Sequence, residues 1–241
     1  MTGPSLDRVA QAALNNARWC DAVCRAHGLR TELTDELWMC HDPPPRFYSR
    51  ATTLGAQPAV EARLRSLLER QPEPASSVKD GFFRVDLTDL GFTELFRADW
   101  LWHPPATDGP TSLAWERVVT DAALLAWEAV WEGAPRPVGQ ARQFPPTLLE
   151  DPDIAFLAGR RDGAIAVVSA LNRSGPVVGL SNAAGADAAS DDGWADHAAV
   201  AARLFPGLPV VGYERGADLE AAQRHGFTSI GPLRVWVPPE G

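Results

Sequence analysis

Hydrophobic and polar residues follow two different periods along the chain, and the periods separate predicted helices from predicted strands. Apolar residues that recur every three to four positions are typical of amphipathic helices. They predict helices at 5–27, 58–71, 121–133, 193–207 and 217–225. Alternating or short apolar runs bounded by turn residues indicate strands. They predict strands at 46–54, 81–87, 92–103, 114–120, three within 152–182, then 208–214 and 227–237.

Local signals mark several of these boundaries. Gly28 and Gly133 end two of the predicted helices, because glycine adopts the left-handed conformation of a C-terminal cap. Thr120 or Asp121 caps the start of the helix at 121–133. Asp162-Gly163 predicts a hairpin turn between two strands.

The clearest linker is the stretch His103 to Ser112, "HPPATDGPTS". It predicts two domains, 1–105 and 106–241. A weak internal repeat crosses this division, since "LGFTELFRADWLWHPP" at 90–105 is similar to "HGFTSIGPLRVWVPP" at 225–239. Two copies of one α+β unit would explain it, with coincidence as the alternative. In that case residues before His103 form a reduced copy, which we expect to lack a strand–loop–helix cofactor unit.

The composition of the chain argues against two classes of binding partner. The formal net charge of −9 argues against broad binding to nucleic acid or anionic membranes. No apolar run approaches the roughly 18 residues that span a bilayer, and the first residues lack a secretory pattern. We therefore expect a cytoplasmic protein.

Three cysteines raise the question of a metal. Cys20 and Cys24 are four residues apart in a predicted helix, and Cys40 is followed by His41. Together they could bind zinc, but the spacing differs from the usual knuckles and adjacent Cys-His is poor ligand geometry. Reduced, buried cysteines that pack on a helix face are the preferred interpretation, so no metal is predicted.

The C-terminal order is strand, helix, three antiparallel strands, helix, strand, helix, strand. With the segments "RDGAIAVVSALNRSGPVVGLSN" and "LPVVGYERGADLEAAQRHGFTSIGPLRVW", it resembles the GNAT (GCN5-related N-acetyltransferase) superfamily from about Trp115 to Val237. The resemblance implies an α+β fold, an α/β/α sandwich with a mixed, mostly antiparallel sheet flanked by helices. It also implies a parallel, splayed strand pair, "GLSN" with "LPVVGYE". An amine substrate and acetyl-CoA or another acyl-CoA as co-substrate are implied as well.

The resemblance places the cofactor on the strand that ends in "GLSNAAG". It implies binding by Leu180, Ser181, Asn182, Ala183 and Gly185, with the pantetheine arm along the backbone edge of the first three. The sequence departs from the family's pyrophosphate loop, since "NAAGADAASDDGWADH" replaces R/Q-x-x-G-x-G/A. Acidic residues at the helix start, Asp191, Asp192 and Asp196, would repel phosphate and weaken CoA binding unless Arg173 or Arg215 compensates.

Catalytic residues are less clearly indicated. Many family members place a tyrosine four residues before the glycine of the "GF" turn, a position occupied here by Ala222. Tyr213 is the nearest substitute acid, and Glu214 beside it is the candidate base. Adjacent strand residues face opposite sides, so at most one of this pair points into a cleft. Other titratable residues are interpreted as solvated, turn-forming or capping residues: Glu128, Glu132, Asp153 and His197.

Three functions remain open from these residues. The first is an acyl-CoA-dependent N-acyltransferase with an unknown amine acceptor. The second is a degenerate GNAT-fold protein that binds a small molecule or a partner without efficient catalysis. The third is a toxin–antitoxin-like or structural interaction protein on the same fold.

Overall fold

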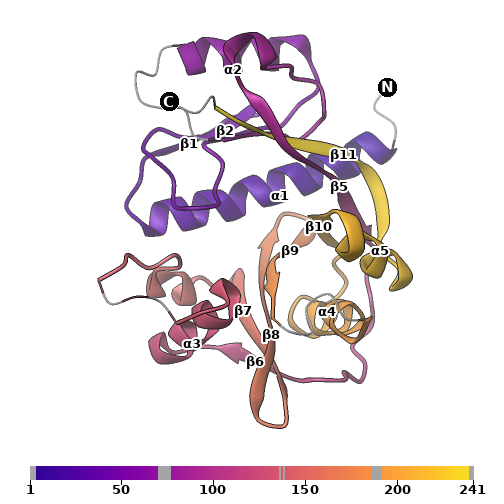
Figure 1. The fold of residues 1–241 in the computed structure, drawn as a ribbon. Helices are drawn as coiled ribbons and strands as arrows, with labels where there is room; N and C mark the ends of the chain where they lie inside the picture. Colours follow the sequence, from indigo (N-terminus) through magenta and orange to yellow (C-terminus); the bar gives the residue numbers. More distant parts are fainter. Residues whose placement is uncertain (1–3, 70–76, 136, 138, 186–190, 239–241) are drawn as a thin grey trace. The chain divides into compact units, whose positions relative to one another are not determined.

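The structure is a computed structural model that describes residues 4–69, 77–135, 137, 139–185 and 191–238, with backbone only at 4–6, 191 and 192 (Figure 1). Its chain divides into two compact units. Unit 1 comprises Met1–Trp100 and Ile230–Gly241, and unit 2 comprises Leu101–Ser229. Strands β5 (Thr93–His103) and β11 (Thr228–Val237) therefore each contribute residues to both units.

Unit 1 is a small sheet with a helix on either face. Its further elements are α1 (Pro4–Ala26), β1 (Thr31–Leu33), β2 (Leu37–Cys40), β3 (Ala51–Thr53), α2 (Pro58–Glu69), β4 (Val78–Asp80) and the 3-10 turn η1 (Thr88–Leu90). The strand order is β1-β2-β3-β4-β11, with β5 next to β11. The pair β3–β4 is parallel, whereas β1–β2, β2–β3 and β4–β11 are antiparallel.

Alternation along β2 separates the two faces of unit 1. Leu37 packs into the cluster that contains Val60 and Leu64 of α2. The next residue, Trp38, donates from Nε1 to Asp21 of α1 over 3.0 Å. Because successive side chains of a strand point to opposite faces, α1 and α2 cover opposite sides of this sheet.

One expectation for the N-terminal half is wrong. Residues 81–87 form no strand, since β4 ends at Asp80, and the buried Asp80 carboxylate accepts from Val85 N at 2.8 Å and Phe82 N at 3.4 Å. These bonds fold the chain back where alternation predicted extension. In the same half, α2 connects the parallel strands β3 and β4. The expected lack of a cofactor unit there stays a prediction.

Unit 2 contains the long antiparallel meander. Its further elements are β6 (Ala114–Val118), α3 (Asp121–Glu132), the 3-10 helix η2 (Pro146–Glu150), β7 (Ile154–Arg161), β8 (Ala164–Ser174), β9 (Val177–Ala184), α4 (Asp191–Leu204), β10 (Val210–Glu214) and α5 (Gly216–Arg224). The strand order is β10-β9-β8-β7-β6. Every neighbouring pair is antiparallel except β9–β10, which is parallel as predicted.

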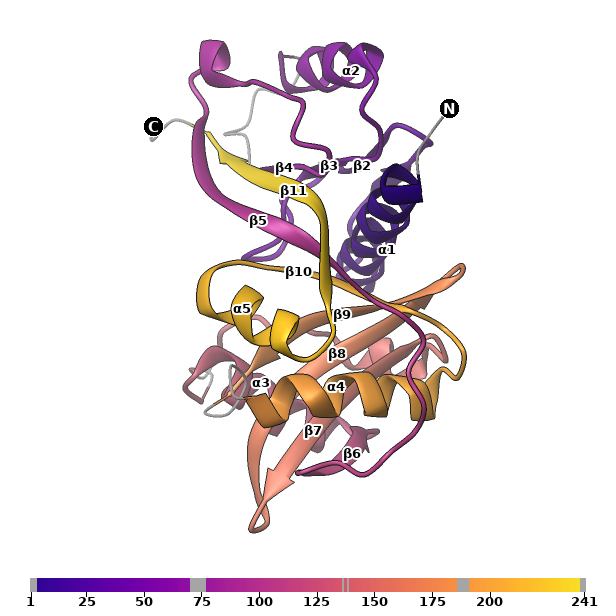
Figure 2. The same cartoon turned by 90° about the vertical axis from the view of Figure 1, so that its right-hand side faces the viewer.

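Helices cover both faces of this second sheet. On β7, Phe156 packs edge-on against Trp127 of α3, with ring centroids 5.1 Å apart. Its neighbours Ala155 and Leu157 belong to the cluster formed with α4 and α5, and Figure 2 shows α4 lying over β7–β9. Thr120 caps α3 through Ala123 N, and Gly133 ends it in the left-handed conformation. The predicted mixed, mostly antiparallel α+β fold is confirmed.

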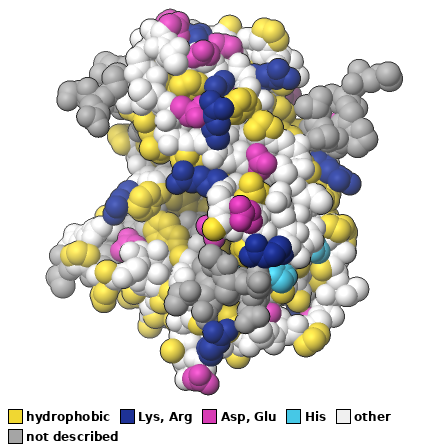
Figure 3. Space-filling view, turned by 45° about the vertical axis from the view of Figure 1, so that its right-hand side comes forward, with side chains coloured by type: hydrophobic (Ala, Val, Ile, Leu, Met, Phe, Trp, Pro, Cys, Tyr) yellow, Lys and Arg dark blue, Asp and Glu magenta, His cyan; other side chains and the backbone are white. Residues whose placement is uncertain are grey.

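None of the described helices is both long and apolar enough to cross a bilayer. On the face shown in Figure 3, acidic and basic side chains are interspersed. Many arginines are paired with carboxylates, for example Arg160 with Glu116 and Arg203 with Asp108.

Candidate functional site

The predicted cofactor residues lie where β9 extends beyond its parallel partner. The pairing of β9 with β10 covers Val178 and Gly179, whereas β9 continues to Ala184. On its other side β9 stays paired with β8 up to Ala184. The backbone from Leu180 onward therefore lies past the last residue of β9 that is in register with β10. An exposed strand edge accepts an extended polar chain through main-chain hydrogen bonds.

A β-bulge shapes this edge at Asn182 and Ala183. Ser181 pairs with Ala170 and Ala184 pairs with Val168, so two residues of β9 oppose the single residue Ser169. Asn182 has a φ of 57°, in the left-handed region that asparagine tolerates better than most residues. A bulge bends its strand and redirects the neighbouring side chains and backbone groups. The bulge thus interrupts the regular hydrogen-bond ladder between β8 and β9 within the predicted cofactor segment.

Gly185 closes the segment under a strict geometric constraint. Its φ is 121°, and a Cβ added there would lie 2.3 Å from the backbone oxygen of Ala166. Only glycine fits this position, so its place in the sequence has a local structural cause. Residues 186–190 lie outside the described residues, and α4 begins at Asp191. The predicted repulsion by Asp191 and Asp192 therefore stays a prediction.

Asp196 of α4 is buried and hydrogen-bonded to another segment of the chain. It is 3% exposed, and its carboxylate accepts from Ser112 N, Leu113 N and Trp115 Nε1 at 2.8 to 3.0 Å, and from Ser112 Oγ at 3.1 Å. These donors belong to the segment that leads into β6. The four bonds fix α4 to that segment, but neutral donors leave the charge of the carboxylate in place. The predicted repulsion of phosphate by Asp196 therefore stays a prediction.

The next residue, His197, is also buried and not a surface or capping residue as predicted. It is 1% exposed and lies beside Trp115 and Trp194, with ring centroids 5.1 and 6.1 Å away. Within the described residues neither ring nitrogen has a hydrogen-bond partner. Burial lowers the pKa of His197 to about 4, although the nearby Asp196 acts in the opposite direction.

The two predicted catalytic residues end β10, the parallel partner of β9. Tyr213 and Glu214 are both half-buried. Burial raises the pKa of the Glu214 carboxyl to about 8, Asp218 adds to the rise and Arg215 opposes it. A carboxyl with that pKa exchanges its proton near neutral pH, which suits a general base or acid. Ala222, at the position of the family's tyrosine, lies fully buried on α5.

Sequence reasoning missed one glycine of this site. An added Cβ at Gly212 of β10 would lie 3.1 Å from the carbonyl oxygen of Leu180, tighter than most contacts. Glycine at this position therefore lets β10 lie close to the Leu180 carbonyl. A glycine inside "VVGYE" was the available signal, because glycine within a strand often marks a close backbone approach.

The other candidate residues take structural roles. Glu128, predicted to be solvated, is buried and accepts from Arg142 Nε at 3.1 Å and Phe144 N at 2.8 Å. Arg173 pairs with Asp153, Nε to Oδ1 at 2.7 Å. The three cysteines are free and buried, and the described residues contain no group of three or more ligands suited to a metal.

Comparisons with known proteins identify the fold. No family model and no curated protein matches the chain. A solved GCN5-related N-acetyltransferase from Kribbella flavida superposes with a TM-score of 0.64 at 19% identity, covering 100% of this chain and 98% of that one. A putative GNAT-family acetyltransferase from Novosphingobium aromaticivorans gives 0.55 at 13% identity, over 95% and 99%. A protein of unknown function from Staphylococcus epidermidis gives 0.56 at 11%, over 85% and 91%. The predicted resemblance is confirmed at the level of structure: this chain has the GNAT fold.

Proposed function

We propose that the chain is an acyl-CoA-dependent N-acyltransferase that transfers an acetyl group from acetyl-CoA, or a related acyl group, to a small-molecule amine. The observation that carries the proposal is that β9 continues beyond Gly179, the last residue in register with β10, and is bulged at Asn182 and bounded by Gly185 and Gly212. A GNAT fold supports it, because the solved structures that superpose include acetyltransferases.

The described residues fit an acyl-CoA along that edge. The pantetheine arm would pair with the backbone of Leu180, Ser181 and Asn182, with Ala183 next in the bulge. Gly212 leaves room at the Leu180 carbonyl, and a side chain there would crowd it. Gly185 would let the chain turn toward the diphosphate. The co-substrate supplies the activated acyl group, and the protein supplies alignment along a rigid strand.

Glu214 is the group best suited to remove the proton from the amine. As the nitrogen attacks the thioester carbonyl, the amine loses a proton to the Glu214 carboxylate and the carbon–sulfur bond breaks. The departing thiolate must then gain a proton. Tyr213 is the candidate donor, but as neighbours on β10 the two side chains face opposite sides. One of them therefore acts directly, and the raised pKa of Glu214 favours Glu214.

A second candidate function is binding without efficient catalysis. The buried Ala222 favours it, because the position of the family's acid carries no titratable group. Calorimetry with CoA and acetyl-CoA separates the possibilities. We expect binding to the wild-type chain and binding at least about tenfold weaker to Gly212→Val. At a concentration of 100 times Kd, binding should stabilise the fold by about 2.7 kcal/mol in a thermal shift assay.

The outcomes are distinct. Binding followed by acyl transfer to an amine panel supports the transferase, and binding without transfer supports the degenerate fold. Absence of binding at millimolar CoA removes the acyltransferase proposal.

A further inference from the structure

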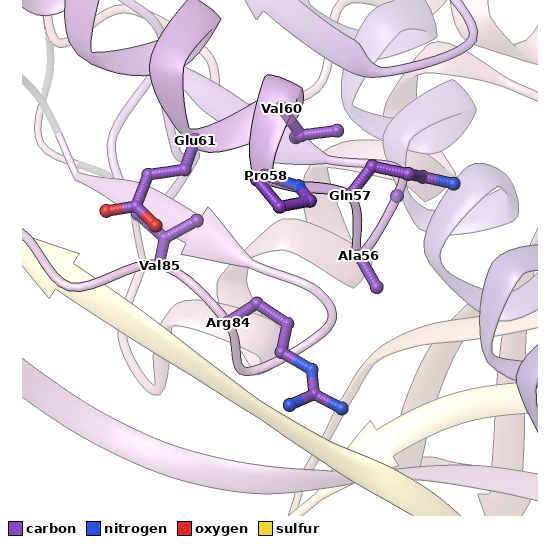
Figure 4. Close-up of a pocket in the computed structure, with 8 residues that line it drawn as sticks. Ala56, Gln57, Pro58, Val60, Glu61, Arg84 and Val85 are labelled. Carbon is purple, nitrogen blue, oxygen red and sulfur yellow. The ribbon is translucent and has the colours of Figure 1, made fainter.

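Unit 1 has a cavity of about 330 Å³ that the proposed acyltransferase site does not use. It opens between the turn that leads into α2 and the segment that follows β4 (Figure 4). Its lining comes from these two segments: Gly55, Ala56, Gln57, Pro58, Val60, Glu61, Arg84 and Val85. The volume lies at the small end of the range for ligand pockets.

The lining separates into an apolar floor and a charged rim. Val60 and Val85 are buried, at 1% and 2% exposure, and give the cavity an apolar base. Arg84 is exposed, and it makes no hydrogen bond or ion pair with any other residue that the structure describes. A guanidinium with no partner beside an apolar cavity offers two parallel donors to a planar anion.

The acidic side chain of the lining is already engaged. Glu61 accepts from Arg65 Nε at 3.0 Å, and Arg65 also binds Asp89. In Figure 4 Glu61 and Arg84 point to different sides of the cavity. The Val60 amide is taken by Gln57 O at 2.9 Å, and Pro58 has no N–H. The start of α2 therefore contributes few donors, and Arg84 is the main contact for an anion.

These features select the charge of the ligand. One guanidinium balances one negative charge, and Glu61 nearby disfavours a second. We propose that this cavity binds a small organic monocarboxylate, with the carboxylate on Arg84 and a short apolar body on Val60 and Val85. The site belongs to unit 1 alone and is independent of the acyltransferase proposal.

The test is titration of the full chain with hexanoate and phenylacetate by ligand-observed NMR and calorimetry. Hexanamide and inorganic phosphate serve as a neutral and a dianionic comparison. We expect saturable carboxylate binding in the millimolar range, and binding at least about tenfold weaker for hexanamide and phosphate.

Variants locate the site. Arg84→Gln should weaken carboxylate binding at least about tenfold, whereas Arg161→Gln, which removes an exposed arginine at the hairpin of unit 2, should leave it unchanged. Ala56→Phe fills the exposed rim while keeping Arg84, and it should also abolish binding. Unchanged affinity in Arg84→Gln and Ala56→Phe, tighter binding of phosphate, or no saturation at all would overturn the proposal. A circular dichroism melt shows that each variant is folded.

Discussion

Each unit contains a strand–helix–strand motif with parallel strands, and the two motifs differ in how far the first strand extends past its partner. In unit 1, α2 connects the parallel strands β3 and β4. In unit 2, α4 connects the parallel strands β9 and β10. All residues of β3 and β4 are buried, and β3 is only three residues long. β9 has eight residues, of which the first four are buried and the last four half-buried. Extending one strand past its partner therefore turns a closed core element into an accessible edge.

The strands that follow each motif begin in the same way. Gly91 and Gly226 both have positive φ, of 80° and 88°. Phe92 N donates to Leu87 O, and Phe227 N donates to Ala222 O, each five residues back and each at 3.2 Å. Both phenylalanines are buried. These shared turns support the proposal that 1–105 is a reduced GNAT-like domain and 106–241 the GNAT-like acyltransferase domain.

The largest expected effect concerns the acidic residue at the end of the second strand of each motif, Asp80 in β4 and Glu214 in β10. Asp80 ends β4 fully buried, accepting from Arg234 Nε at 3.1 Å. Glu214 ends β10 without a hydrogen-bond partner among the described residues. If Glu214 is the base, Glu214→Gln should lower the acyl-transfer rate by roughly 100- to 10,000-fold with little change in unfolding free energy. The wild-type rate should rise with pH up to about 8, because the base must be ionised, and the variant should be flat.

Asp80→Asn is the matched control. It should lower stability through the buried ion pair with Arg234 and leave the pH profile unchanged. An unaltered transfer rate in Glu214→Gln would remove the base assignment.

The next contrast is how each motif holds its helix. α2 packs with Val60 and Leu64, whereas α4 is fixed by the buried Asp196. Asp196→Ala leaves the donors of Ser112, Leu113 and Trp115 without their acceptor and should cost roughly 3 kcal/mol or more. Glu61→Ala on α2 removes only a partly exposed pair with Arg65 and should cost less than about 1 kcal/mol. Urea unfolding measures both, and equal effects would contradict the contrast.

Parts of this arrangement were predictable because their signals are local. The meander β7–β9 and helices α2 to α5 follow from periodicity and caps within single segments. The roles of Asp196 and Glu128 depend on donors far along the chain, such as Ser112 and Phe144. The turn after β4 was missed because "GFFRVDL" alternates like a strand, and only the buried Asp80 reverses it. The cofactor edge at Leu180 was predicted from the family resemblance. The role of Gly212 could not be predicted, because it depends on how β10 lies against β9 at Leu180.

A smaller difference in stability is expected between the glycines that follow the first strand of each motif, Gly55 after β3 and Gly185 after β9. At Gly185 an added Cβ meets the Ala166 backbone oxygen at 2.3 Å with φ at 121°. At Gly55 the contact is also 2.3 Å, but to the flexible end of the Gln57 side chain. Gly185→Ala should therefore cost about 2 to 3 kcal/mol and weaken CoA binding, whereas Gly55→Ala should cost less than about 1 kcal/mol. Thermal and urea unfolding compare the two, and a larger loss in Gly55→Ala would refute the distinction.

The smallest expected effect is a pH dependence of the unfolding free energy, caused by His197 of α4. Its pKa is lowered from 6.5 to about 4 by burial, so the unfolded chain binds the proton more readily than the folded one. The stabilisation is complete above pH 6.5 and is lost as the pH falls from 6.5 toward 4. Between pH 7.5 and 5 the loss should be about 2 kcal/mol.

His197→Phe keeps an aromatic ring between Trp115 and Trp194 and cannot titrate. The difference in unfolding free energy between wild type and variant should therefore change by that amount over this range. A wild-type slope that persists in His197→Phe would show that another group carries the titration.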